Sequence, residues 1–160
     1  MSSCVIPGSF DPVTEGHTNL ISRAAKLFDQ VTVVIMINVR KKGSFTPEER
    51  AALMRKACAK MPNVKVEIWD GLLSAYMRAR GERTVIRGVR NTAEYDAESV
   101  SAQANRQLNP DMETLLMPAG EGKAWVSSSA VKEIAAFGGD ISAFIPQACA
   151  EEIIRRLTNA

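Results

Sequence analysis

The sequence predicts an α/β fold: one domain, residues 1–160, built on a doubly wound parallel sheet of five strands with helices on both faces. First, apolar segments typical of strands alternate five times with segments of helical periodicity. That order favours parallel strands joined by helical crossovers, and right-handed crossovers place helices on both faces of the sheet. Second, a chain of 160 residues with 46% hydrophobic and 24% charged residues suits one globular domain with one substantial core.

The segment after the first predicted strand organises the rest of the prediction. Residues 4–6 form a short apolar run, residues 7–17 a loop with prolines and glycines, and residues 18–28 place apolar side chains on one helical face. Thr14 is a suitable N-cap, which puts the chain's one histidine, His17, at position N3. Because the first N–H groups of a helix are unpaired and carry partial positive charge, we expect a phosphate to bind there and contact His17.

The remaining elements follow from apolar runs, helix caps and helix stops. Four further strands are predicted at residues 31–37, 64–68, 84–86 and 113–117. Apolar and polar residues alternate in the second of these, which predicts an edge or half-covered strand. Further helices are predicted from Thr46-Pro47, an N-cap and N1 pair, to about residue 60, and at 72–80, 93–108, 127–137 and 146–157.

Polar loops follow four of the five predicted strands. They comprise residues 7–17, 40–42, 87–90 and 123–129. Since the carboxyl ends of parallel strands share one edge of the sheet, and ligands of such folds bind there at the switch point of the strand order, we expect these loops to form one site.

Composition and motif searches exclude several classes of protein. A net charge of +2 is too small to indicate nucleic acid or an anionic membrane as partner, and no run approaches the roughly 20 apolar residues of a membrane span. Three widely spaced cysteines argue against disulfides and zinc, and the apolar start ends at Pro7, so we expect a reduced, cytoplasmic protein without a signal peptide. The sequence contains neither a GxxxxGKS/T loop nor a GxGxxG fingerprint, and no pattern supports a hydrolase triad.

Two candidate site features have a purely structural interpretation as well. His17 could simply satisfy backbone groups at the start of its own helix, and the run Ser127-Ser128-Ser129 could simply cap the next one. In the functional interpretation, the serine run binds a pyrophosphate group. The helix N-terminus then keeps His17 neutral, so that its imidazole donates one N–H to a phosphoryl oxygen.

Several motifs together resemble a known family. Thr14-Glu15-Gly16-His17 resembles the (T/H)xGH signature of the nucleotidylyltransferase superfamily, and residues 127–132 resemble its second signature in the SSSxVK form. Together with Arg87-Gly88-Val89-Arg90, the pair Lys41-Lys42 and residues 45–50, they resemble the bacterial phosphopantetheine adenylyltransferases over almost the whole chain.

That resemblance implies a Rossmann-like sheet, a homohexamer and the reaction of ATP, accompanied by Mg²⁺, with 4′-phosphopantetheine to give dephospho-coenzyme A and pyrophosphate. Coenzyme A is implied as a feedback inhibitor. The catalytic residues implied are His17, which stabilises the transition state, Lys41 and Arg90. The residues implied for phosphopantetheine are Ser9, Lys41, Leu73 and Arg87. The residues implied for ATP are Ser9, Phe10, His17, Gly88, Val89, Arg90, Glu98, Lys123, Ala124, Trp125, Val126, Ser127, Ser128 and Ser129.

This chain departs from the commonest family pattern at Ile6, where tyrosine is frequent, and at Ser9, where a hydroxyl is kept in place of threonine. The 119–126 loop differs from the usual aromatic-rich version and is one residue longer. Two alternatives stay open. The chain could use CTP with a phosphorylated alcohol or ATP with nicotinamide mononucleotide, or it could be a sensor that binds coenzyme A or ATP without turnover.

Overall fold

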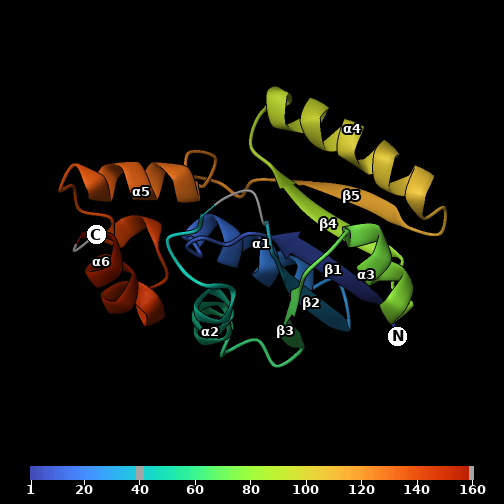
Figure 1. The fold of residues 1–160 in the computed structure, drawn as a ribbon, viewed down its shortest axis with the longest axis horizontal. Coiled ribbons are helices and arrows are strands. Elements are labelled where there is room, and N and C mark those ends of the chain that lie inside the picture. The colour runs from blue at the N-terminus through green and yellow to red at the C-terminus, as the bar shows by residue number, and fades with distance from the viewer. Residues whose placement is uncertain (39–41, 159–160) are drawn as a thin grey trace.

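Five parallel strands form one sheet in the computed structural model, which describes residues 1–38 and 42–158 (Figure 1). The strand order is β3-β2-β1-β4-β5, and every pair is parallel. The strands are β1 (Ser3–Gly8), β2 (Gln30–Met36), β3 (Val64–Trp69), β4 (Thr84–Val89) and β5 (Glu113–Pro118). The predicted five-stranded parallel sheet is confirmed, and the alternating third strand is an edge strand, as expected.

Six α-helices accompany the strands in the described part of the chain: α1 (Glu15–Ala25), α2 (Pro47–Ala57), α3 (Leu73–Arg80), α4 (Thr92–Leu108), α5 (Ser128–Ala136) and α6 (Ala150–Thr158). The predicted N-cap at Thr46 is confirmed: it forms a capping box with Glu49, and Pro47 lies in the first turn. The last helix begins later than predicted. Pro146 has an extended backbone and precedes a short 3₁₀ turn, Gln147–Cys149, so α6 starts only after that turn.

The sheet is covered on both faces, which confirms the doubly wound arrangement. Successive side chains of a strand point to opposite faces. Cys4 and Ile6 of β1 accordingly belong to the larger core, which α1, α2, α5 and α6 complete. Val5 points into a smaller core that is closed by Tyr76 and Met77 of α3. Figure 1 shows α4 lying along β4 and β5, while α5 and α6 lie side by side at the other end of the molecule.

The order of the strands places the switch point between β1 and β4. From β1 the chain builds outward through β2 to the edge strand β3, and then crosses back to β4 and β5 on the other side. β1 is aligned with β2 over six residue pairs but meets β4 at the single pair Val5↔Val85. The carboxyl ends of β1 and β4 can therefore diverge, which is where such folds bind ligands.

No helix in the described ranges is long and apolar enough to cross a membrane.

Candidate active site

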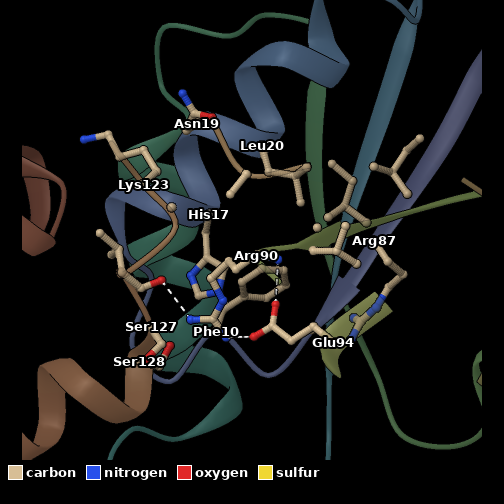
Figure 2. Close-up of a pocket in the computed structure, with 18 of the residues that line it drawn as sticks. Phe10, His17, Asn19, Leu20, Arg87, Arg90, Glu94, Lys123, Ser127 and Ser128 are labelled. Carbon is tan, nitrogen blue, oxygen red and sulfur yellow. Dashed lines mark hydrogen bonds and ion pairs between the residues drawn. The ribbon is translucent and has the colours of Figure 1, made fainter. Parts of the chain in front are cut away.

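A cavity of about 400 Å³ opens at the carboxyl ends of β1 and β4 (Figure 2). Its walls come from the β1–α1 loop, the start of α1, the end of β4, one face of α4 and the β5–α5 loop. The structure thus brings together three of the four loops that the sequence predicted to converge. The fourth loop carries Arg40 and Lys41, which lie outside the described residues, and Lys42, which is exposed.

Most of the residues predicted to bind ATP line this cavity. They are Ser9, Phe10, His17, Gly88, Val89, Arg90, Glu98, Lys123, Val126, Ser127, Ser128 and Ser129. Ala124 and Trp125 are exposed and are absent from its lining. The Trp125 ring instead packs edge-on against Phe144, with ring centroids 4.8 Å apart. A nucleotide role for these two residues stays a prediction.

The β1–α1 loop is fixed by the buried carboxylate of Asp11. Its Oδ2 accepts a hydrogen bond from the backbone N–H of Ser44, and its Oδ1 accepts one from Phe45, each at 2.9 Å. The ammonium group of Lys132, on α5, lies 3.5 Å from Oδ2. One carboxylate therefore ties together the loop after β1, the segment just before α2 and the helix that follows the serine run.

Two further hydrogen bonds hold the backbone of this loop, one from α2 and one from α5. Arg50 of α2 donates to the carbonyl oxygen of Ser9 at 2.9 Å, and the hydroxyl of Ser128 on α5 donates to the carbonyl oxygen of Pro12 at 2.8 Å. Between them Phe10 has a φ of 47°, the left-handed region that side chains rarely adopt. Its ring packs edge-on against the imidazole of His17, with centroids 4.9 Å apart, so the loop's strained residue supports the predicted catalytic side chain.

His17 completes the cap of α1, and this role settles which nitrogen carries its proton. Thr14 is the N-cap and His17 occupies N3, as the sequence predicted. The backbone N–H of Thr14 donates to Nδ1 of His17 at 3.0 Å, while the backbone N–H of His17 donates to the Thr14 hydroxyl at 3.4 Å. A neutral ring that accepts at Nδ1 carries its hydrogen on Nε2. Nε2–H is thus available as a donor at the cavity wall.

The surroundings of His17 keep the ring neutral. Burial, followed by the positive charges of Arg90 and Arg87, lowers the pKa of His17 from 6.5 to about 4. The predicted neutral imidazole is confirmed, although burial rather than the helix N-terminus is the main cause. The structural and functional interpretations of His17 are also compatible, because capping uses Nδ1 and leaves Nε2.

The two arginines at the end of β4 are each held by a carboxylate of α4. Nε and Nη2 of Arg87 donate to the carboxylate of Glu98 at 2.9 and 2.6 Å, and its Nη1 donates to the carbonyl oxygen of Pro7 at 2.6 Å. Arg90 pairs with Glu94, and its Nη1 donates to the carbonyl oxygen of Val126 at 3.2 Å (Figure 2). Both guanidinium groups are therefore oriented before any anion binds.

The serine run both caps α5 and faces the cavity. Ser127 is the N-cap, and its hydroxyl accepts a hydrogen bond from the backbone N–H of Ala130 at 3.1 Å. The start of α5 therefore faces the cavity with the partial positive charge of a helix N-terminus. Lys123 adds a nearby cation, 3.9 Å from the carboxylate of Glu15.

A second cavity of about 300 Å³ adjoins the first between α3 and α4. Its lining includes Leu73, predicted to contact phosphopantetheine, and Met36, Asn105 and Thr114. The two cavities share five residues of their walls: Pro7, Gly8, Ser9, Arg87 and Glu98. Ser9 and Arg87, both predicted to bind phosphopantetheine, therefore lie where the two spaces meet.

Sequence reasoning missed the residues that hold the site in shape. The sequence does indicate a partner for Arg90 in Glu94. Glu94 lies four residues after Arg90 and four before Glu98, and residues at this spacing are neighbours on a helix. The backbone groups that Asp11 and Arg50 bind across the β1–α1 loop lie more than 30 residues away along the chain, so no local pattern indicates these contacts.

The described residues do not form a metal site of their own. Among residues 1–38 and 42–158 no group of three His, Cys, Asp or Glu side chains could hold a metal ion. The carboxylates near the cavity already have cationic partners: Glu94 with Arg90, Glu98 with Arg87, and Asp11 with Lys132.

Comparison with known proteins identifies relatives of this chain. The family model for cytidylyltransferase-like proteins matches residues 5–134. The chain is 40% identical over 153 residues to the phosphopantetheine adenylyltransferase of Finegoldia magna, covering 96% of this chain and 94% of that protein. It is 42% identical over 153 residues to the enzyme of the same name from Rubrobacter xylanophilus, covering 96% and 93%.

A solved structure with the same fold comes from Vibrio parahaemolyticus and is described as a candidate nicotinate-nucleotide adenylyltransferase. The TM-score is 0.66, with 98% of this chain and 96% of that chain covered. At 15% identity this likeness shows the fold alone. The identities near 40% over nearly the full chain show more: the chain belongs to the phosphopantetheine adenylyltransferases of the cytidylyltransferase-like family.

Proposed function

We propose that this protein transfers the adenylyl group of ATP to 4′-phosphopantetheine, which yields dephospho-coenzyme A and pyrophosphate. The observation that carries the proposal is the shared wall of the two cavities. The larger, lined by His17, Arg90 and the serine run, suits a nucleoside triphosphate, and the smaller suits a narrow, mostly uncharged arm. An acceptor phosphate at Ser9 and Arg87, where the cavities meet, would lie beside the α-phosphate of the nucleotide.

The reaction is an in-line displacement. An oxygen of the phosphopantetheine phosphate forms a bond to the α-phosphorus of ATP. The bond from that phosphorus to the oxygen bridging to the β-phosphate breaks, and pyrophosphate leaves with the electron pair. The attacking oxygen is already ionised at neutral pH, because the second pKa of a phosphate monoester is about 6, so no general base is needed. Catalysis then consists of positioning and of stabilising charge on the α-phosphate.

His17 supplies that stabilisation as a neutral donor. Its Nδ1 is occupied by the backbone N–H of Thr14, which fixes the ring and leaves Nε2–H for a phosphoryl oxygen. ATP and phosphopantetheine are both anions and repel each other as they approach. The positive charges of Arg90 and Arg87, which are fixed in place, offset that repulsion. The role proposed for Lys41, holding the attacking phosphate, stays a prediction because Lys41 lies outside the described residues.

Mg²⁺, in this proposal, arrives with ATP rather than on a protein site. The support is the partnered state of the carboxylates at the cavity. When bound to the triphosphate, the ion would offset phosphate charge. None of the steps assigned here to His17, Arg87 or Arg90 requires a protein ligand to the metal.

Assembly, location and regulation belong to the same proposal. Self-association is supported by large apolar side chains left exposed on α4 and β5, namely Tyr95, Val100, Leu108 and Leu115, and the family resemblance implies that the assembly is a homohexamer. A cytoplasmic location is supported by three buried free cysteines.

Coenzyme A, which contains the same pantetheine arm, would inhibit by occupying the smaller cavity. Light scattering should give six times the mass of one chain, and inhibition by coenzyme A should be competitive with phosphopantetheine.

The test of the reaction is pyrophosphate release from ATP and Mg²⁺, measured with and without 4′-phosphopantetheine. We expect release that requires phosphopantetheine. Two other substrate pairs are tested in parallel. One is ATP with nicotinamide mononucleotide, and the other is CTP with a phosphorylated alcohol. Faster release with either pair would overturn the assignment of the acceptor. ATP binding without release under any of these conditions would favour a nucleotide sensor.

A further inference from the structure

Arg90 and Glu94 are joined by contacts that involve both the side chain and the backbone of the arginine. The Glu94 carboxylate accepts from Nη2 of Arg90 through Oε1 and from the backbone N–H of Arg90 through Oε2, the latter at 2.9 Å. Both residues line the larger cavity, where the close-up shows them facing each other (Figure 2). The carboxylate thus fixes the guanidinium relative to the chain that carries it.

Glu94 is itself fixed by the start of α4. Asn91 is the N-cap of that helix, and its side-chain oxygen accepts from the backbone N–H of Glu94 at 2.9 Å. A glutamate in the first turn is also favoured by the helix dipole. Hydrogen bonds from Arg90, together with its charge, outweigh the opposing effect of burial and keep the pKa of Glu94 below its usual value. At neutral pH this carboxylate is therefore charged and stationary.

The contacts of Arg90 leave much of its hydrogen-bonding capacity for an anion. A guanidinium has five N–H donors. The side-chain contacts of Arg90 engage one donor with Glu94 and one with the carbonyl oxygen of Val126, which leaves three. A free arginine side chain loses rotamer entropy when it binds an anion, and an arginine already held in place loses less.

We propose that Glu94 is a positioning residue for Arg90, holding the guanidinium at the cavity wall so that it meets the nucleotide phosphates already oriented. This inference rests on the proposed function, because it takes ATP as the occupant of the larger cavity. It assigns Glu94 to the ATP side of the reaction. The other carboxylate of the pair, Glu98, holds Arg87, which lies between the two cavities.

Electrostatics and positioning predict opposite effects for the loss of this carboxylate. Glu94 is a negative charge in an anion-binding cavity, so if it merely opposed ATP, its removal would tighten ATP binding. If it positions Arg90, its removal weakens ATP binding although the cavity becomes more positive. The sign of the change therefore decides between the two roles.

The experiment compares Glu94→Gln with Asp96→Asn, a matched control. Asp96 is an exposed carboxylate on the same helix, so its substitution removes the same charge without touching an arginine. For Glu94→Gln we expect kcat/KM for ATP to fall on the order of tenfold, the value of one charge-assisted hydrogen bond, with KM for phosphopantetheine unchanged. Equilibrium binding of ATP should weaken in parallel. Asp96→Asn should behave like the parent chain.

The same substitution in an Arg90→Ala background completes the test. A positioning residue has nothing left to position there, so adding Glu94→Gln to Arg90→Ala should not weaken ATP binding further, and loss of the negative charge should if anything tighten it. The inference is overturned by tighter ATP binding in Glu94→Gln, by a change no larger than that of Asp96→Asn, or by an equal loss in the Arg90→Ala background. If the parent chain binds ATP but releases no pyrophosphate, the proposed function fails, while the ATP-binding comparison still decides the role of Glu94.

Discussion

The backbone N–H of Thr14 donates to Nδ1 of His17 at 3.0 Å, so the chain's one histidine caps its helix with one ring nitrogen and leaves the other for the cavity. In most capping boxes a glutamate or glutamine occupies this N3 position. A histidine there gives the same reciprocal cap and adds a rigid N–H donor. Stability of α1 and chemistry at the cavity therefore depend on the same side chain.

We predict that His17 titrates with a midpoint of about 4 rather than near 6.5, because burial and two arginines oppose its protonation. The measurement is the chemical shift of the imidazole carbon-bound protons in NMR spectra recorded from pH 8 to pH 3.5. One histidine in the chain makes the assignment unambiguous. Nitrogen shifts at neutral pH should identify the Nε2–H form. A midpoint near 6.5 would contradict the burial described here.

The same pKa shift predicts how His17 contributes to acid sensitivity. Between pH 6.5 and about 4 the unfolded chain protonates this histidine and the folded chain does not, so the unfolded state binds more protons. The contribution of His17 to the free energy of unfolding therefore falls as the pH is lowered through this window and is constant below it. Urea unfolding should therefore show that the parent loses stability relative to His17→Gln as the pH falls from 6.5 to 4, because glutamine does not titrate.

Substitution of His17 should separate capping from catalysis. His17→Ala removes both Nδ1, which accepts from the Thr14 N–H, and the Nε2–H donor at the cavity. We therefore expect the free energy of unfolding to fall by about 1 kcal/mol and the turnover rate to fall by a factor on the order of 10²–10³. His17→Gln restores an N3 acceptor for the Thr14 N–H, and should recover the melting temperature without recovering turnover. Thermal denaturation and pyrophosphate release, measured on the same samples, test both expectations. Near-normal turnover in a folded His17→Ala protein would remove the catalytic role.

Asp11→Ala should destabilise the protein and disturb the cavity. It leaves the backbone N–H groups of Ser44 and Phe45 without their acceptor, and buried unsatisfied donors cost about 1–3 kcal/mol each. Asp11→Asn retains one acceptor oxygen and should lose less. Asp70→Ala, an exposed aspartate directly after β3, is the matched control and should change the urea midpoint little. Equal midpoints for Asp11→Ala and Asp70→Ala would show that the carboxylate does not hold the loop.

Gly8→Ala should crowd the ring that supports His17. A Cβ atom at Gly8 would lie 2.8 Å from Cζ of Phe10, closer than carbon atoms approach in folded proteins. Overpacking of this kind typically costs about 1–3 kcal/mol. The smaller side chain in Gly8→Ala with Phe10→Leu should return part of the lost stability, as measured by urea unfolding. If the second substitution only adds to the loss, the crowding at Phe10 is not the cause.

Local patterns were enough to predict the sheet, most of its helices and the edge of the sheet at which three polar loops meet. Apolar runs and caps are properties of neighbouring residues, so Thr14, Thr46 and the strand around Val64 could be placed from sequence alone. The turn after Pro146 was not foreseen, because proline is compatible with either kind of helix start. The anchoring by Asp11 and Arg50 could not be predicted, since it depends on residues brought near only by the fold.

The anchoring of the β1–α1 loop also bears on when, during its synthesis, the chain can first bind a nucleotide. The bond from Ser128 to Pro12 joins residues 116 positions apart, and that from Ser44 to Asp11 joins residues 33 apart. Contacts between residues so far apart along the chain slow folding and depend on the intervening elements, so contacts of this kind form late. A nascent chain can pair β1 with β2 early, but it has no complete cavity until α5 has left the ribosome and docked. Nucleotide can therefore stabilise the finished protein but cannot guide the first steps of its folding.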